Sequence, residues 1–173
     1  MLMLAGAGAA EPRAPTLQTH TGPWYQPGAA FVERLWKPGQ PGQRLHLRGR
    51  VLDTRGAALA DALIELWHTD AAGNYPPLRA SRQSDAHGRF GIVTVLPGHN
   101  QGYRARHIHF VVSHPGHARL VTRIYFKGDV NMDEAPYPEL AVFVEESEID
   151  GQSVLFAEVE FVLAEDSSGT LDN

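Results

Sequence analysis

Residues 44–53 read RLHLRGRVLD, and over the first half of this stretch polar and apolar residues alternate. Alternation with a period of two is the pattern of a β-strand that buries one face and exposes the other. Near the other end of the chain, residues 153–163 read SVLFAEVEFVL and alternate in the same way. The sequence therefore predicts a long half-buried strand near each end of a sheet protein.

Shorter strand-like runs lie between these two stretches. They cover residues 62–68, 89–95, 107–113 and 120–126. Turn-forming pairs such as Pro97-Gly98 and Pro115-Gly116 separate them, and only residues 133–147 are expected to hold one or two helical turns. Short strands at this spacing predict an all-β fold, an antiparallel β-sandwich with short helical turns in the connections.

The length of 173 residues fits one domain, which we expect to span residues 22–165. Residues 1–21 are rich in Ala, Gly, Pro and Thr, and residues 166–173 are polar, so both ends are expected to be flexible. Within the first of these, Ala7-Gly8-Ala9 has the small-residue pattern of a signal cleavage site, but no basic region precedes it. A cytoplasmic location is therefore expected, and a truncated export signal is the alternative.

The composition excludes several classes of function. A net charge of -5 and a pI of about 6.0 give no basic excess for nucleic-acid binding. The chain has no run of about 18 apolar residues and no Lys/Arg-rich amphipathic stretch, so no membrane partner is expected. It has no cysteine, which excludes disulfides, thiol nucleophiles and iron–sulfur clusters. A bound metal would have to use His, Tyr, Asp or Glu.

The strongest candidate for such a site is His107-Ile108-His109. Residues i and i+2 of a strand face the same side, so the two imidazoles should lie next to each other. The nearby Arg104 and Arg106 favour the neutral imidazole, which is the form that binds a metal. These features indicate a two-histidine metal site, although two packed or surface histidines would give the same pattern.

Several motifs in order resemble the intradiol ring-cleavage dioxygenases. They are GPWY at residues 22–25, ELWHTDAAGNY at 65–75, RQSDAHGRF at 82–90, RARHIHF at 104–110 and TRIYFKGD at 122–129. The resemblance covers roughly residues 21–132 and is closest to the catalytic subunit of protocatechuate dioxygenase and its small single-domain relatives. The middle motifs are specific in combination.

The resemblance implies a β-sandwich enzyme that uses non-haem Fe(III) and O2 to cleave a small aromatic ortho-diol to a muconate-type diacid. In that family two tyrosines and two histidines hold the iron. By motif, Tyr75 matches the tyrosine that stays bound, and His107 and His109 match the two histidines. Arg104 matches the catalytic arginine that stabilises negative charge on the substrate. Family members often form oligomers, so a homo-oligomer is an open expectation.

This sequence departs from the family pattern at the second tyrosine, which should follow Pro97-Gly98 closely. His99 and Asn100 stand there instead, and the nearest tyrosine is Tyr103. Either Tyr103 reaches the metal and accepts a proton from the diol, or this ligand is missing or replaced.

A second departure is Arg123, where the family usually has Gln. Arg106 and Arg123 could steer an anionic substrate such as a carboxylated catechol, because guanidinium binds carboxylate with two hydrogen bonds. Solvated surface arginines would fit the sequence equally well.

Two other interpretations of the chain stay open. The stretch from residue 45 to residue 98 alone would suit a non-catalytic β-sandwich binding module, which would not need Tyr75, His107 and His109 together. The other interpretation is a related metalloprotein with an altered ligand set or with another metal. The displaced Tyr103 motivates it.

Overall fold

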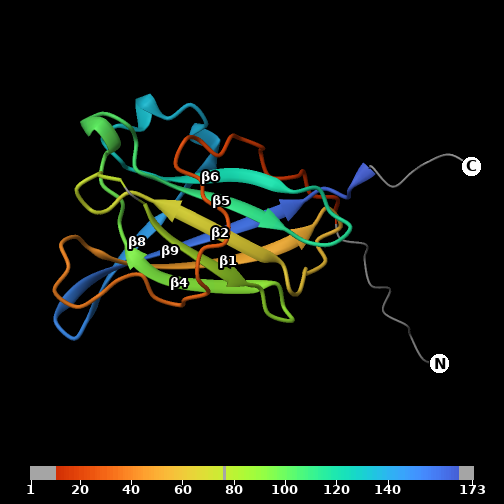
Figure 1. The fold of residues 1–173 in the computed structure, drawn as a ribbon, viewed down its shortest axis with the longest axis horizontal. Helices are drawn as coiled ribbons and strands as arrows, with labels where there is room; N and C mark the ends of the chain where they lie inside the picture. The colour runs from red at the N-terminus through yellow and green to blue at the C-terminus, as the bar shows by residue number, and fades with distance from the viewer. Residues whose placement is uncertain (1–10, 76, 168–173) are drawn as a thin grey trace, which may run out of the picture.

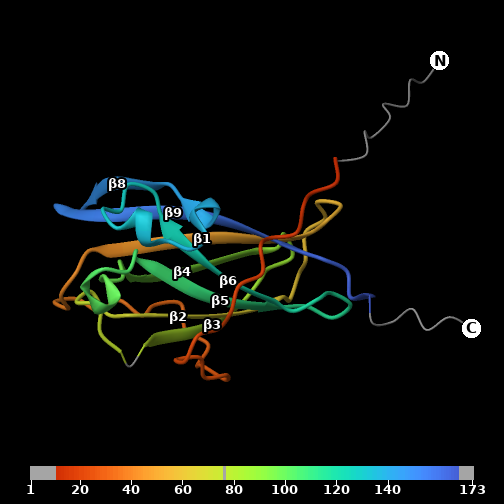
Figure 2. The same ribbon diagram turned by 90° about the horizontal axis from the view of Figure 1, so that it is seen from above.

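Two β-sheets pack face to face in this computed structural model, which describes residues 11–75 and 77–167 (Figures 1 and 2). One sheet has the order β4 (Arg89–Val95), β1 (Arg44–Asp53), β9 (Gln152–Leu163) and β8 (Val144–Ile149). The other has the order β3 (Leu78–Gln83), β2 (Leu63–His68), β5 (His107–Ser113), β6 (Leu120–Phe126) and β7 (Ala141–Val142). The predicted β-sandwich is confirmed.

Most neighbouring strands are antiparallel, as predicted, but two pairs are parallel. The long alternating strands β1 and β9 lie side by side in parallel, from Arg44 opposite Val154 to Asp53 opposite Leu163. The short strand β7 pairs in parallel with β6. A period of two reveals a strand but not the direction of its neighbour, so the sequence could not have distinguished these pairs.

The core lies between the inward faces of the two sheets. Phe161 of β9 packs against Phe110 of β5, with ring centroids 4.9 Å apart. The alternation of β1 buries Leu45, Leu47 and Val51 against the opposite sheet. Burial of such side chains stabilises each by about 1.5–3 kcal/mol relative to exposure, so the apolar phase fixes which face of each strand points outward.

The short strand β7 was not predicted, and neither were β3 and β8. Their sequences, LRASRQ and VEESEI, lack a hydrophobic alternation. The helical turns expected within residues 133–147 are present as 3₁₀ turns at Met132–Glu134 and Pro138–Leu140. A third 3₁₀ turn, Asn100–Gly102, lies before β5 and carries Gln101 and Gly102 at positive φ.

Residues 13–31, here called the N-terminal segment, run across the outer face of the sheet that contains β5 (Figures 1 and 2). The backbone N–H of Thr19 donates to the Val121 carbonyl at 2.7 Å, and that of Ser81 donates to the Ala30 carbonyl at 2.9 Å. The described part of the expected flexible region, from residue 13 onward, is thus hydrogen-bonded to the sandwich, while residues 1–10 and 168–173 lie outside the described residues. The boundaries of the domain stay predictions.

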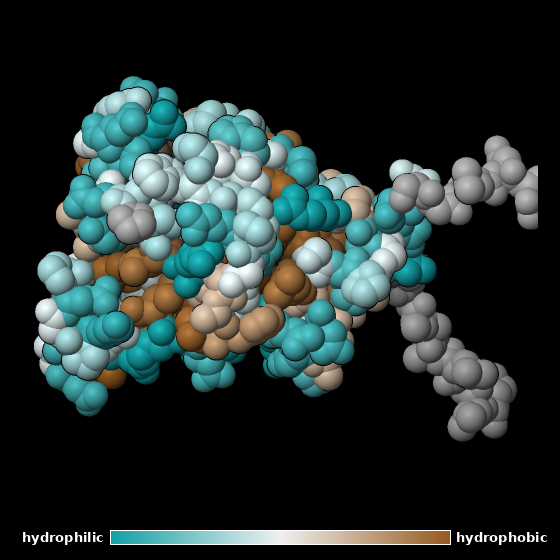
Figure 3. All heavy atoms as spheres, in the orientation of Figure 1, coloured by the Kyte–Doolittle hydropathy of each residue, from teal (hydrophilic) through white to brown (hydrophobic). Residues whose placement is uncertain are grey.

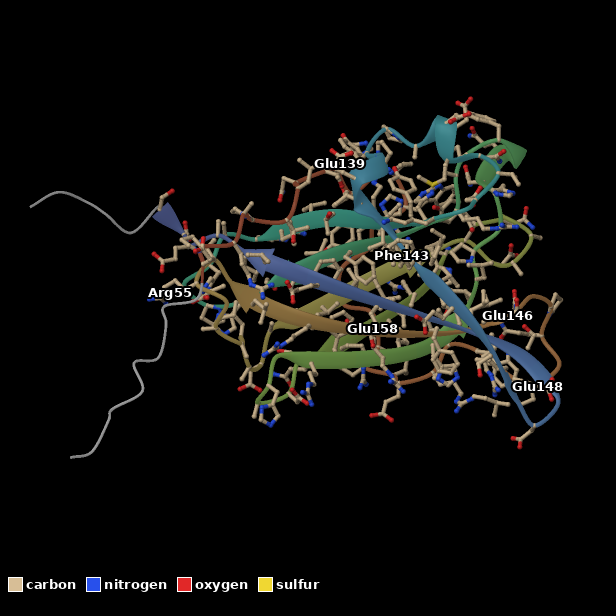
Figure 4. The ribbon with its side chains drawn as sticks, turned by 180° about the vertical axis from the view of Figure 1, so that it is seen from behind. Arg55, Glu139, Phe143, Glu146, Glu148 and Glu158 are labelled. Carbon is tan, nitrogen blue, oxygen red and sulfur yellow. The ribbon has the colours of Figure 1, made fainter. Side chains whose placement is uncertain are left out.

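Figures 3 and 4 show the two outer faces of the sandwich. The face under the N-terminal segment mixes apolar and polar surface (Figure 3). The outer face of the other sheet carries Glu158 on β9 and Phe143, 72% exposed, next to β8, whose Glu146 and Glu148 lie near its far end (Figure 4). No helix in the described part of the chain is long and apolar enough to cross a membrane.

His68 ends β2 inside the sandwich and gives the fold a dependence on pH. Its two ring nitrogens lie 2.7 Å from the Thr69 carbonyl and 2.8 Å from the Thr94 hydroxyl. Burial lowers the pKa of His68 to about 4, despite the opposing effect of the Thr69 bond.

We predict that His68 destabilises the metal-free protein as the pH falls from 6.5 toward 4. The unfolded histidine takes up a proton near 6.5 and the folded one only near 4, so the unfolded state binds more protons in this window. Between pH 7 and pH 5 the free energy of unfolding should fall by about 2 kcal/mol through this group. Urea unfolding at both pH values measures this, and His68→Gln should lose that part of the change. An identical pH dependence in both proteins would contradict the account.

Candidate metal centre

His107 and His109 lie on the outer face of β5, beneath the N-terminal segment. In the sheet His109 lies opposite Trp67 of β2 and Arg123 of β6, and His107 lies opposite Tyr125 of β6. The centroids of the two imidazole rings are 4.8 Å apart. The predicted side-by-side arrangement of the two histidines is therefore present.

A pocket of about 130 Å³ brings most of the predicted site residues together. Tyr75 reaches it from the loop after β2, Arg104 from the loop before β5, and both histidines from β5 itself. The remaining walls come from the N-terminal segment, Trp67, Arg123, Asn100 and Gln101. Of the five residues predicted for the metal or the chemistry, only Tyr103 does not line this pocket.

Both histidines are neutral near pH 7. Burial lowers the pKa of His107, as do Arg123 and Arg104, while its bond to the Ala105 carbonyl opposes this. Burial also lowers the pKa of His109 to about 2, with smaller effects from His107 and Arg123. Neutral imidazole is the form that binds a metal.

The orientation of each imidazole is fixed differently. Nδ1 of His107 lies 2.7 Å from the Ala105 carbonyl oxygen. A carbonyl only accepts, so Nδ1 carries the proton and Nε2 keeps its lone pair free. The ring of His109 stacks on the ring of Trp67, with centroids 4.9 Å apart and planes 3° apart. Its Nδ1 is buried without a hydrogen-bond partner among the described residues.

Tyr75 stacks on Trp24 of the N-terminal segment, with ring centroids 4.7 Å apart and planes 11° apart. Burial raises the pKa of the Tyr75 phenol, while Arg123 and Arg104 oppose this rise. A cation beside the phenol oxygen would favour the phenolate further.

The pocket is positively charged. Arg123 is 4% exposed, and its Nη2 donates to the His20 carbonyl oxygen at 3.0 Å. Arg104 contributes a second guanidinium, and no Asp or Glu of the part of the chain that the structure describes lines the pocket. Among the described residues, neither arginine forms an ion pair with a carboxylate. Two unneutralised cations around a small cavity favour an anionic ligand.

Tyr103 is not brought to this pocket. Its side chain is 51% exposed, its hydroxyl donates to Gln101 Oε1 at 2.9 Å, and the Arg104 guanidinium lies 5.7 Å from its ring centroid. The preceding 3₁₀ turn directs it outward. The predicted role of Tyr103 as a ligand and proton acceptor thus gains no support from its placement.

His99 and Asn100 stand where the family pattern has the second tyrosine; Asn100 lines the pocket, but the ring of His99 turns away from it. His99 Nε2 lies 2.9 Å and 3.1 Å from the two carboxylate oxygens of Asp129. Arg106 also turns toward Asp129, with its Nη1 3.8 Å from Asp129 Oδ2, and does not line the pocket. Of the two arginines predicted to steer an anionic substrate, only Arg123 faces the cavity.

The pocket residues that sequence reasoning missed include His20, Trp24 and Trp67. The GPWY motif contains Trp24, but no local pattern says that residues 20–24 fold over a strand about 85 residues away in the chain. Trp67 alternates in phase with Glu65 on the outer face of β2, which would have placed it beside the histidines once the strand order was known.

The donor set suits a hard trivalent metal. Among residues 11–75 and 77–167, no three His, Cys, Asp or Glu side chains cluster so that they could hold a metal. A metal in this pocket would therefore need the phenol oxygen of Tyr75 beside His107 and His109. An anionic phenolate with two neutral imidazoles fits Fe(III).

A family model described as "Dioxygenase" matches residues 20–163. The chain belongs to the intradiol dioxygenase family. It is 37% identical over 143 residues to catechol 1,2-dioxygenase 2 of Acinetobacter lwoffii, covering 66% of this chain and 52% of that protein. It is 37% identical over 116 residues to the protocatechuate 3,4-dioxygenase beta chain of Burkholderia cepacia, covering 54% of this chain and 49% of that protein. The chain thus spans about half the length of these curated relatives.

Solved structures give the same result. The structure of 3-chlorocatechol 1,2-dioxygenase from Rhodococcus opacus 1CP superposes with a TM-score of 0.78 and 27% identity, covering 91% of this chain and 76% of that one. The dioxygenase domain of a dioxygenase and carbohydrate-binding protein fusion from Streptomyces sp. SirexAA-E gives a TM-score of 0.77 at 27% identity. That match covers 88% of this chain and 100% of the dioxygenase domain.

We predict that His109→Ala lowers the bound iron at least tenfold, because two protein ligands hold a metal far less well than three. Elemental analysis after iron loading and gel filtration measures the metal content. His114→Ala removes a histidine from the β5–β6 turn outside the pocket and is the control. Equal iron in the His109→Ala variant and the control, both folded by circular dichroism, would show that the metal site is elsewhere.

Proposed function

We propose that this chain catalyses the intradiol cleavage of a catechol-type ortho-diol with O2 to a muconate-type diacid, with non-haem Fe(III) as its cofactor. The observation that carries the proposal is the convergence of Tyr75, His107, His109 and Arg104 on one small pocket. Family membership supplies the reaction class. A non-catalytic module would have no need for this combination.

Tyr75, His107 and His109 would hold the iron. Ferric iron, when bound, supplies Lewis-acid activation of the diol. The protein's own contribution is mainly electrostatic: Arg104 and Arg123 favour the deprotonated diol and stabilise negative charge that develops on its ring. Trp24, stacked on Tyr75, and Trp67, stacked on His109, restrict the access of water to these groups.

The protons of the diol need an acceptor, and the exposed Tyr103 is poorly situated for this role. Among the described residues lining the pocket, His20 is the one base that is not assigned to the metal. Its Nε2 lies 3.3 Å from Arg123 Nη2. Because a guanidinium only donates, Arg123 occupies the lone pair of His20 Nε2, so we assign no described pocket residue as the acceptor of the diol protons.

The substrate is proposed to be a single-ring diol with an acidic substituent. A volume of about 130 Å³ lies well below the roughly 300–1,000 Å³ of sites for larger ligands. The buried Arg123 has no carboxylate partner among the described residues, so a carboxylate on the substrate could form an ion pair with it.

A second candidate function is a metalloprotein of the same fold with a different reaction. The outward position of Tyr103 and the turn of His99 toward Asp129 favour it, because three protein ligands would remain instead of four. The two candidates differ in their products.

We predict that the iron-loaded protein converts catechol or a carboxylated catechol to a ring-opened diacid in which both atoms of ¹⁸O2 appear. Dioxygen consumption and mass spectrometry of the product measure this. Tyr75→Phe, which keeps the ring stacked on Trp24 but removes the phenol oxygen, should lose the activity. Oxidation of the diol to a quinone without labelled oxygen would favour the second candidate.

We also predict that Arg123→Gln changes the preference among substrates. The loss of a charge-assisted contact worth about 1.5–3 kcal/mol should lower kcat/KM for a carboxylated catechol by roughly 10- to 100-fold relative to catechol. Arg119→Gln alters an exposed arginine of the same strand region and is the control. An equal loss for both substrates would assign Arg123 to the pocket wall rather than to substrate recognition.

A further inference from the structure

Asp129, in the turn after β6, has a buried carboxylate that the proposed chemistry does not use. Its side chain is 1% exposed. Besides His99, it accepts the backbone N–H of Asn131 at 2.8 Å and that of Arg106 at 3.1 Å. Burial alone would raise the pKa of Asp129, but these bonds outweigh burial and hold the pKa below its ordinary value. The carboxylate is therefore ionised in the folded protein near pH 7.

The peptide group between Ala105 and Arg106 is bonded at both ends. Its N–H donates to Asp129 Oδ2 at 3.1 Å. Its carbonyl oxygen lies 2.7 Å from His107 Nδ1. A peptide group is planar and rigid, so a force that orients its N–H also orients its carbonyl. The chain of contacts thus runs from a buried carboxylate, through one peptide, to an imidazole of the candidate metal centre.

We propose that Asp129 is a positioning residue for His107, acting through the 105–106 peptide. It holds the peptide in the plane in which the carbonyl accepts the Nδ1 proton, so that Nε2 presents its lone pair to the pocket. The negative charge of Asp129 also polarises the peptide, which makes Nε2 of the imidazole a stronger electron-pair donor to a metal. The inference rests on the proposed function in one respect: that His107 binds the metal.

His99 completes this arrangement from the other side. It donates to the same carboxylate, and its carbonyl packs so closely on Gly73 that a Cβ there would lie 2.3 Å from the oxygen. His99 therefore ties the Asp129 turn to the loop that carries Tyr75.

Asp129→Asn tests the proposal, because it preserves the size of the side chain and removes its charge. In the metal-free full-length chain, long-range ¹H–¹⁵N spectra should show His107 with its proton on Nδ1 in the wild type and a mixture of tautomers in the variant. The Arg106 amide proton should move upfield. The affinity for Fe(III) should fall by roughly 10- to 100-fold, as for other groups that support a metal-bound histidine.

Asp85→Asn is the matched control. Asp85 accepts two backbone N–H groups, of His87 and Arg89, both at 2.8 Å, in a turn outside the pocket. This variant should keep the iron affinity, the His107 tautomer and the midpoint of thermal unfolding of the wild type. If Asp129→Asn behaves in the same way, the residue only closes a turn and the proposal is wrong.

The wild type decides the matter even if Asp129→Asn does not fold. A His107 proton on Nε2 in the metal-free protein would overturn the proposal without any variant. Neither the tautomer nor the iron affinity depends on turnover. If the chain cleaves no diol, the role of Asp129 can still be supported. If the chain is active and Asp129→Asn has no effect, only the role of Asp129 is refuted and the proposed function stands.

Discussion

The alternation of side chains along β5 is the constraint on which both the fold and the site depend. Ile108, Phe110 and Val112 point into the core and are fully buried, while His107 and His109 point the other way. A shift of one residue in this strand would exchange the two sets, leaving imidazoles in the core and apolar side chains in the pocket. The packing of the sandwich therefore fixes where the two histidines lie relative to Trp67, Arg123 and Tyr125.

The sequence was sufficient for the strands with a clear hydrophobic period and for the residues on them. His107 and His109 follow from local alternation, and the family motifs correctly bring Tyr75 and Arg104 to the same pocket. The parallel pairing of β1 with β9 could not be predicted, because the period of a strand does not encode its neighbour. The polar strand β3 and the acidic strand β8 are held by backbone hydrogen bonds and edge contacts, which leave little mark on composition.

Features that depend on contacts distant in sequence were also beyond prediction. The N-terminal segment forms a wall of the pocket although its composition suggested a flexible end. The outward turn of Tyr103 results from a 3₁₀ turn with two residues at positive φ, Gln101 and Gly102. The 105–106 peptide forms one hydrogen bond with Asp129 and one with His107, and no motif records either contact. In each case the missing information is a tertiary contact rather than a local preference.

In the proposed centre, Tyr75, His107 and His109 bind ferric iron, and a diol binds directly to that iron. The visible absorption spectrum of the iron-loaded protein, before and after addition of catechol or protocatechuate without O2, tests it most directly. The account predicts a broad tyrosinate-to-iron band that shifts when the diol is added, and that is absent in Tyr75→Phe. A protein that stays colourless after iron loading would contradict the phenolate ligand and with it the proposed centre.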